Sequence, residues 1–269
     1  MPVVRLFFTE RALLRILMIG DIIGKPGRQA VRELVPSLRR EFSIDLVIAN
    51  GENTAGGFGI TAETAYELLE NGVDVLTSGN HIWDQKEIIP YLDEGLPLIR
   101  PANYPDAPGR GFLTHGDVMV INLMGRVFMP ALDCPFRTAD RLLREVKAEL
   151  SPPVIIVDFH AEATSEKQAL GWYLDGRVSA VLGTHTHVGT VDTRILPKGT
   201  AYVSDGGMTG PVDSVIGSDT GVALDRFLTG MPQRLTVAAG PSRMNSVLID
   251  VDPRSGRALA IERLDRMVS

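Results

Sequence analysis

Four of the chain's five histidines stand in short polar segments that follow apolar runs of strand length. Acidic and amide residues occupy the same kind of position. The full set is Asp21, Glu52, Asn53, Asn80, His81, His160, His185 and His187. Each of these residues is of a type that binds metal ions or transfers protons. Together they supply two carboxylates, two amides and four imidazoles.

This combination of side chains suits a pair of metal ions. A two-metal hydrolase needs a carboxylate to bridge the ions and further oxygen and nitrogen ligands to hold them roughly 3.5 to 4 Å apart. A bridging water then becomes acidic enough to act as hydroxide. Mixed imidazole, carboxylate and amide ligation suits Mn, Fe or Zn, whereas Ca and Mg prefer oxygen ligands. The four histidines therefore favour transition metals.

Each residue also has an ordinary structural interpretation. Asp21 follows a strand-like run and could cap the next helix by accepting a backbone N–H. A lone histidine is more often structural than a ligand, and His115, before Gly116 and Asp117, has that interpretation. It is the joint occurrence at five strand ends that favours a functional site.

The elements that must position these residues can be read from the apolar pattern. Continuous apolar runs, typical of strands buried on both faces, occupy residues 14–20, 45–50, 73–78, 154–159 and 178–183. Amphipathic stretches lie between them, marked by Val31 to Leu38, Thr64 to Leu69 and Leu142 to Val146. Alternating strands and helices predict a layered α/β sandwich, in which the loops leaving the carboxyl ends of the strands meet at one edge.

The alternation breaks between about residues 96 and 132 and again after Thr190. Residues 97–103, 116–124, 190–205 and 245–252 are interpreted as further strands with hairpin-like links. They predict a mixed sheet or two packed sheets. The segment Gly206 to Pro241, rich in Gly, Pro, Ser and Thr, predicts long loops around one short helix.

Composition limits the partners. A net charge of −6 and a pI near 5.4 argue against stable binding to long nucleic acid, but a small anionic substrate remains compatible with a metal site. The single cysteine, Cys134, excludes an internal disulfide and fits a reducing cytoplasm. Enzymes of this size commonly form homo-oligomers, and the sequence leaves that state open.

The N-terminal segment carries no targeting signal that we recognise. Charged residues, among them Arg5, Glu10 and Arg11, interrupt its apolar patches, so neither a membrane span nor a signal peptide is expected. Residues 1–12 are predicted to be an extension, and residues 13–269 a single domain.

Other motifs give weaker signals. The glycine-rich segment after the first strand lacks the spacing of a phosphate loop, and Cys134 has no identifiable base partner. The segment Ala55 to Ile60 either lets backbone approach the site or turns the chain. Asp205 to Gly207 follow a strand and are placed beside the site but not among its ligands.

Several motifs, in order along the chain, carry a family resemblance. They are IGDIIGKPGR, NGENTAGGFGIT, TSGNHIWDQKEI, DFHAEATSEK, GTHTHV and SDGGMTGP, which cover the chain from about Leu14 to its end. The GNH and GTHTHVG segments resemble the calcineurin-like metallophosphoesterase superfamily. The whole set resembles its YmdB-like branch, described as 2′,3′-cyclic-nucleotide 2′-phosphodiesterases. The resemblance implies an α/β/β/α sandwich with mixed sheets.

The sequence departs from the superfamily pattern at the first motif. The usual Asp-x-His is absent, because Ile22 and Ile23 follow Asp21. Asn53 could fill the vacant ligand position, and Glu52 stands where the superfamily usually has a bridging aspartate. The resemblance therefore implies that one of the two metal ions would have harder ligands than in most of the superfamily.

The resemblance also implies roles for the site residues. Asp21, Glu52, Asn53 and His187 would surround one metal ion. Glu52 would bridge to a second ion held by Asn80, His160 and His185. His81 would remain unliganded, bind the phosphate and protonate the leaving oxygen.

The implied reaction is hydrolysis of a cyclic nucleotide, from the 2′,3′-cyclic form to the 3′-nucleotide, by a hydroxide that bridges two ions of Fe or Mn, with Zn as a further candidate. Two alternatives stay open. The chain could be a metallophosphatase or nuclease with another phosphoester substrate. It could also be a metal-binding regulatory protein with little turnover.

Overall fold

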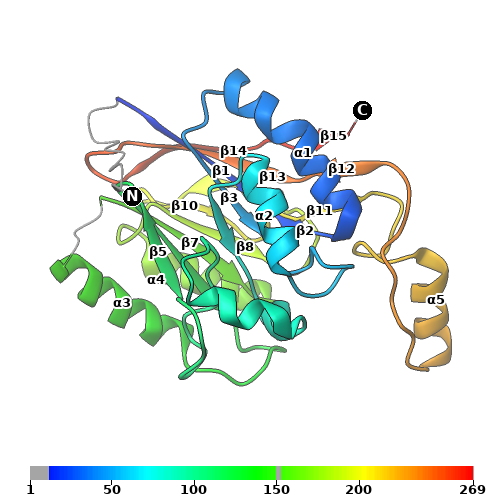
Figure 1. Ribbon diagram of the computed structural model, residues 1–269. Helices are drawn as coiled ribbons and strands as arrows, with labels where there is room; N and C mark the ends of the chain where they lie inside the picture. Colours follow the sequence, from blue (N-terminus) through cyan, green and yellow to red (C-terminus); the bar gives the residue numbers. More distant parts are fainter. Residues whose placement is uncertain (1–11, 150–152, 269) are drawn as a thin grey trace.

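The structure is a computed structural model that describes residues 12–149 and 153–268 (Figure 1). The predicted extension, residues 1–12, lies outside the described residues except for Ala12. Within the described ranges, no helix is both long and apolar enough to cross a membrane.

The first sheet has five strands in the order β14-β13-β1-β3-β4. Their bounds are β14 (Ala258–Arg263), β13 (Ser246–Val251), β1 (Leu14–Ile19), β3 (Leu46–Asn50) and β4 (Val75–Thr77). β1, β3 and β4 are parallel, whereas β13 runs antiparallel to both β1 and β14. The register sets Leu14 opposite Val251, so the two ends of the chain share one sheet.

The second sheet has six strands in the order β5-β6-β7-β8-β10-β9. Their bounds are β5 (Phe112–His115), β6 (Val118–Met124), β7 (Val154–His160), β8 (Ala180–Thr184), β10 (Ala201–Val203) and β9 (Arg194–Ile195). The four central strands are parallel and the two edge strands antiparallel. A small third sheet joins β15 (Arg266–Met267), β12 (Ser242–Met244), β11 (Met208–Pro211) and β2 (Asp21–Ile22).

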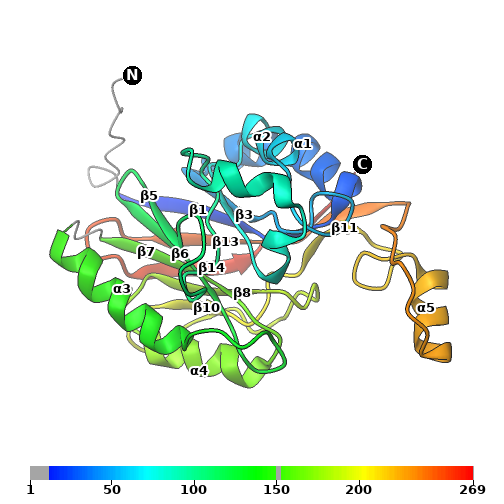
Figure 2. The same cartoon turned by 60° about the horizontal axis from the view of Figure 1, so that its bottom comes forward.

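Helices cover the outer faces of both large sheets. α1 (Gly24–Glu41) and α2 (Ala62–Glu70) lie on the first sheet, together with the 3-10 helices η1 (Asn80–Trp83) and η2 (Lys86–Leu92). α3 (Pro135–Glu149) and α4 (Thr164–Leu174) lie on the second. Figure 2 shows these helices on opposite sides of the two sheets, and α5 (Thr220–Thr229) standing apart from the main body.

Three hydrophobic clusters account for the layers. Successive residues of a strand face opposite sides of its sheet, and β1 follows this rule. Leu17 packs toward the helices of the first layer, while Met18 packs between the two sheets. The third cluster lies between the second sheet and its helices, where Ile155 and Leu170 are buried. The order is therefore helix, sheet, sheet, helix, and the predicted α/β/β/α sandwich is confirmed.

Some predicted elements were wrong or missing. Residues 97–103 form no strand, only a single bridge from Leu98 to Leu76, because Pro97 and Pro101 lack the N–H that a longer ladder would need. The prediction did not include α4 or the strands of the small sheet. The five long apolar runs all became strands, within two residues of the predicted bounds.

Candidate metal centre

Parallel strands deliver the predicted site residues to one edge of the molecule. Glu52 and Asn53 follow β3, and Asn80 begins η1 just after β4, all on the first sheet. His160 ends β7 and His185 directly follows β8, both on the second sheet. Because the carboxyl ends of the parallel strands in the two sheets face the same edge, residues from both sheets meet there.

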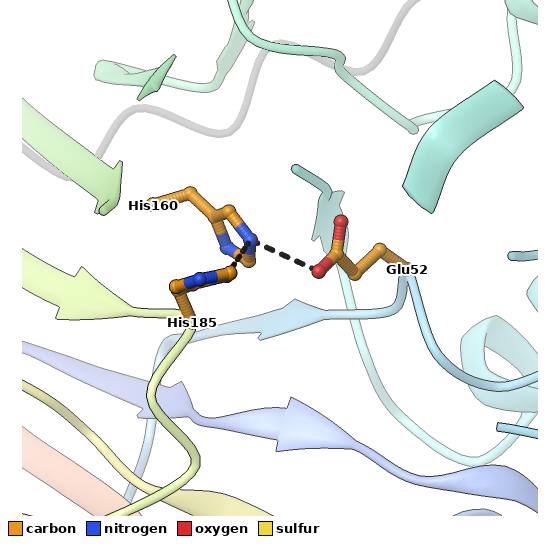
Figure 3. Close-up of side chains that lie close together, drawn as sticks. All are labelled: Glu52, His160 and His185. Carbon is orange, nitrogen blue, oxygen red and sulfur yellow. Dashed lines mark hydrogen bonds and ion pairs between the residues drawn. The ribbon is translucent and has the colours of Figure 1, made fainter. Parts of the chain in front are cut away.

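Three of these residues converge on a nitrogen of a fourth, His160. The Nε2 of His160 lies 3.0 Å from Glu52 Oε1, 3.1 Å from Asn80 Oδ1 and 3.0 Å from His185 Nδ1. Figure 3 shows the Glu52 carboxylate and the His185 ring turned toward the His160 ring. Candidate ligand atoms of Glu52, His160 and His185 all lie within 4.8 Å of one another. A mixed oxygen and nitrogen set of this kind fits a transition-metal ion.

A second group lies on the other side of Glu52. The Oδ1 of Asp21 is 3.9 Å from His187 Nε2, and the Asn53 amide is 3.4 Å from the same nitrogen. The Asn53 amide is also 3.4 Å from Glu52 Oε1. One oxygen of Glu52 therefore borders both groups, as a carboxylate that bridges two ions must.

Asp21 provides the test of whether the site fits metal. Its side chain is fully buried, and one oxygen, Oδ2, accepts the backbone N–H of His185 at 3.1 Å. The other oxygen, Oδ1, has no hydrogen-bond partner among the described residues. A buried carboxylate oxygen without a partner is costly, and a cation held with His187 and Asn53 would satisfy it.

The electrostatics of the protein without metal show the same demand for positive charge. Burial would lower the pKa of His160, but the carboxylates of Glu52, Asp21 and Asp158 raise it to about 9. Burial would raise the pKa of Glu52, but His160 lowers it to about 2. Burial and the His160 cation lower the pKa of His185 to about 3. A protonated His160 thus compensates the surrounding carboxylates in the absence of metal.

His81 lies at the edge of this cluster and takes no part in the ligand contacts. Its backbone N–H donates to Glu52 Oε2 at 2.9 Å, which holds the segment against the Glu52 carboxylate. Its ring Nδ1 lies 2.8 Å from Asp84 Oδ2. The Phe58 ring meets the imidazole edge to face, with centroids 5.2 Å apart. His81 also lines the pocket beside the cluster.

A buried network orients His160. Its Nδ1 lies 3.0 Å from the hydroxyl of Thr184, and that hydroxyl donates to Asp158 at 2.7 Å. Burial raises the pKa of Asp158 to about 7, although hydrogen bonds from Thr77 and Thr184 oppose the shift. Partners of this kind fix the ring and the nitrogen that a ligating histidine presents.

Asp205 supports the loop that carries His185 and His187. Both residues have positive φ, 101° and 64°, a conformation that non-glycine residues rarely adopt. Asp205 accepts hydrogen bonds from the backbone N–H and the hydroxyl of Thr186, at 3.0 and 2.8 Å. It also forms a fully buried ion pair with Lys167 at 2.6 Å. Asp205 therefore supports the loop, consistent with its placement outside the ligand set.

Gly79 lets the two sheets approach at the site. A Cβ at this position would lie 2.2 Å from Cδ2 of His160, closer than real side chains come. Only a glycine before Asn80 therefore allows the end of β4 to pack against the imidazole.

A pocket of about 350 Å³ opens beside the two groups. Glu52, Asn53, His81, His185 and His187 line its inner end. Its walls are largely apolar and come from Ile23, Phe58, Ile216, Leu235 and Val237. A pocket of this size holds a small ligand with its polar end at the cluster.

Several residues with structural roles at the site were not predicted. Glu162 lies 3.1 Å from His185 Nε2, and Asp84 contacts His81. Neither directly follows a strand, so neither belongs to the pattern of polar residues at strand ends. The sequence did offer one clue to Asp84, since it stands three residues after His81 at the spacing of one helical turn. The Lys167–Asp205 pair joins residues 38 apart and has no local signal.

Comparison with known proteins agrees with the geometry. The model of the family described as YmdB-like protein matches residues 17–264. The chain belongs to the YmdB-like family. This confirms the resemblance seen in the sequence motifs.

Relatives of this YmdB-like protein match it over most of its length. It is 51% identical over 256 residues to the 2′,3′-cyclic-nucleotide 2′-phosphodiesterase of Bacillus subtilis (strain 168), covering 93% of this chain and 96% of the relative. A crystal structure of a hypothetical protein from Thermus thermophilus superposes with a TM-score of 0.89 at 46% identity, covering 95% of this chain and 100% of that one. A novel phosphatase from Mycoplasma pneumoniae also gives 0.89, at 32% identity, covering 95% and 94%.

Proposed function

We propose that this YmdB-like protein is a metal-dependent phosphodiesterase that hydrolyses 2′,3′-cyclic nucleotides to 3′-nucleotides. The observation that carries the proposal is the position of the Glu52 carboxylate between two ligand groups, His160 with His185 and Asn80 on one side, and Asp21 with Asn53 and His187 on the other. The name of the Bacillus subtilis relative supports the substrate class.

The donor set supports two transition-metal ions, Fe or Mn in preference to Zn. Asp21 and Asn53 give one ion a harder, oxygen-rich surrounding, whereas His160 and His185 give the other more nitrogen. When bound, such ions acidify a water molecule and neutralise charge on the phosphoryl oxygens.

The protein's own residues complete the reaction. In the hydrolysis, the oxygen of water bonds to phosphorus, the bond from phosphorus to the ribose 2′ oxygen breaks, and that oxygen takes up a proton. In this proposal His81 donates this proton, which is supported by its position in the pocket lining with Glu52 and by the contact of its Nδ1 with Asp84. Imidazole suits the role because its proton exchanges near neutral pH.

The pocket beside the site favours a small substrate. The pocket beside the cluster is of mononucleotide scale, and its apolar walls suit a base and ribose.

Cys134 is a free, partly exposed thiol, which fits the reducing environment of the cytoplasm.

The test is a substrate panel with and without metal. Purified protein is stripped with a chelator, reloaded with Mn or Fe, and assayed on 2′,3′-cyclic, 3′,5′-cyclic, linear dinucleotide and monoester substrates. We expect turnover only after reloading, with the 2′,3′-cyclic substrate preferred and the 3′-nucleotide as product. Preference for a monoester would instead favour a phosphatase. Turnover at background with two metals bound per chain would favour a regulatory protein.

The role of His81 is tested by His81→Gln. We expect the variant to keep its bound metal and lose about 10²- to 10⁴-fold in kcat, the usual contribution of a general acid. His115→Gln is the matched control, because His115 ends the edge strand β5 and does not line the pocket. Equal turnover in wild type and His81→Gln would remove His81 from the mechanism.

A further inference from the structure

The pocket beside the candidate metal centre adjoins a larger groove that a mononucleotide in the pocket would leave empty. The groove has a volume of about 890 Å³, against about 350 Å³ for the inner pocket. The two share Gly56, Phe58, Leu235, Thr236 and Val237 in their linings, so they lie next to each other on either side of these residues. A substrate that filled only the inner pocket would leave the larger outer groove unused.

The outer groove is positively charged in a protein that is negatively charged as a whole. Lys25, Arg226 and Arg234 line it, and the described residues of its lining include no aspartate or glutamate. All three side chains are exposed, and none forms an ion pair with a described residue. The chain's net charge is −6, so a groove with three free cations and no acid is locally unusual. Such a surface attracts phosphate groups.

The loop that separates the two parts presents an aromatic ring to both. In the loop Ala55 to Gly59, the N–H of Ala55 donates to the carbonyl of Gly59 at 2.9 Å, which closes the turn. Gly56, Gly57 and Gly59 have positive φ, and the Gln85 side chain donates to the Phe58 carbonyl at 3.0 Å. Phe58 is thereby fixed at the junction of pocket and groove. An aromatic ring between a phosphate site and a basic groove is a typical stacking position for a base of single-stranded nucleic acid.

We propose that the substrate extends beyond a mononucleotide and is the end of a short single-stranded RNA that carries a 2′,3′-cyclic phosphate. The inference rests on the proposed function. The terminal nucleotide occupies the inner pocket, with its cyclic phosphate at the metal centre. The preceding phosphodiester lies in the groove against Lys25, Arg226 and Arg234. This does not conflict with the low affinity for long nucleic acid expected from the net charge, because only one or two phosphates are engaged.

The experiment compares adenosine 2′,3′-cyclic phosphate with a diadenylate and a triadenylate that end in the same group, using metal-loaded protein. In wild type at low ionic strength we expect kcat/KM to be about 10-fold higher for the diadenylate, the size of one charge-assisted contact. The advantage should shrink as salt is added, because it comes from phosphate contacts.

Two triple variants assign the effect to the groove. The groove variant combines Lys25→Gln, Arg226→Gln and Arg234→Gln. It should abolish the advantage of the diadenylate and leave kcat/KM for the mononucleotide within about twofold of wild type. The control variant combines Lys198→Gln, Arg254→Gln and Arg257→Gln and so removes the same charge. These residues lie near Pro153, just before the start of β7 and at the opposite end of that strand from His160. The control should keep the advantage.

The outcomes separate this inference from the function on which it rests. If wild type hydrolyses the mononucleotide and the diadenylate equally well, or if the control triple loses the advantage as fully as the groove triple, the groove assignment is wrong and the phosphodiesterase activity stands. If neither compound is hydrolysed by metal-loaded protein, the proposed function itself fails.

Discussion

Asp84 is the partner that distinguishes His81 from the other histidines of the site. Its carboxylate lies 2.8 Å from Nδ1 of His81 and contacts no candidate metal ligand that the structure describes. Because the bond fixes the ring's direction, Asp84→Asn should lower kcat by about 10-fold or more, with KM and bound metal little changed. Steady-state kinetics and metal analysis on the same preparation test this.

Asp84→Glu provides the matched comparison, since it keeps the carboxylate and should restore part of the lost kcat. An Asp84→Asn variant that loses metal, or that changes only KM, would show that the residue supports the fold or binds substrate instead of positioning His81.

His160 predicts how metal binding depends on pH. Its pKa of about 9 in the metal-free protein means that it carries a proton at pH 7, and a ligating imidazole must release that proton. Metal uptake at pH 7 should therefore release at least about one proton. The number should fall by about half a proton at pH 9, where half of the His160 rings are already neutral. Calorimetry in buffers of different ionisation enthalpy measures it.

The raised pKa of His160 also makes the stability of the metal-free protein depend on pH. The pKa of His160 is raised on folding, from 6.5 to about 9, so its ion pairing stabilises the metal-free protein fully below pH 6.5. That contribution is lost as pH rises through 9.

Proton release on metal binding that is absent at pH 7, or larger at pH 9, would contradict the assigned charge of His160.

At the scale of elements, the contact between η1 and β7 depends on Gly79. A methyl group there would meet the His160 ring, so Gly79→Ala should cost about 1 to 3 kcal/mol in unfolding free energy and reduce the bound metal. Denaturant unfolding and metal analysis measure the two effects.

Gly221→Ala is the control for that substitution. Gly221 lies in the first turn of α5, where a Cβ would meet only the exposed Asp219 side chain, at 3.3 Å, and alanine there should change the unfolding free energy by no more than about 1 kcal/mol. If Gly79→Ala binds metal and unfolds as wild type does, the close approach of η1 to His160 is not needed.

The elements also show where sequence reasoning succeeds. Runs such as those of β1 and β7 were predictable because strands buried on both faces are apolar over most of their length. α4 was missed because Glu166 and Lys167 are among its buried residues, so its apolar spacing is masked. β11 was missed because MTGP is short and contains Gly and Pro, which normally argue against a strand.

The site was predictable to the extent that it depends on strand ends. All eight proposed residues lie at the edge where the parallel strands end, because that edge follows from topology. Glu162 depends instead on how the loop folds back after β7, which no residue spacing reports, and Asp84 is marked only by its spacing of three residues from His81. The roles of the eight residues remain predictions that the variants above test.

On the scale of the whole molecule, the candidate metal centre combines residues from the two large sheets. Glu52, Asn53 and Asn80 come from the first sheet and His160 and His185 from the second, so bound ions should tie the layers together. At metal concentrations 100 times the Kd, binding adds about 2.7 kcal/mol to the stability of the folded state. For a chain of this size we expect Tm to rise by about 5 to 10 °C over the chelated protein.

Differential scanning fluorimetry with chelator and with added Mn measures this shift. His160→Gln should show a much smaller rise. A wild-type Tm that is insensitive to metal would mean that these residues do not bind the ion in the folded protein.

The place of β13 between β14 and β1 has a consequence for synthesis on the ribosome. β1 is made first, yet one of its neighbours ends at Val251, so that edge stays unpaired until nearly the whole chain has left the exit tunnel. An open edge of apolar strand is a template for wrong pairing. The nascent chain therefore carries an aggregation-prone edge for almost its entire translation, and premature termination before β13 would leave a product that exposes it permanently.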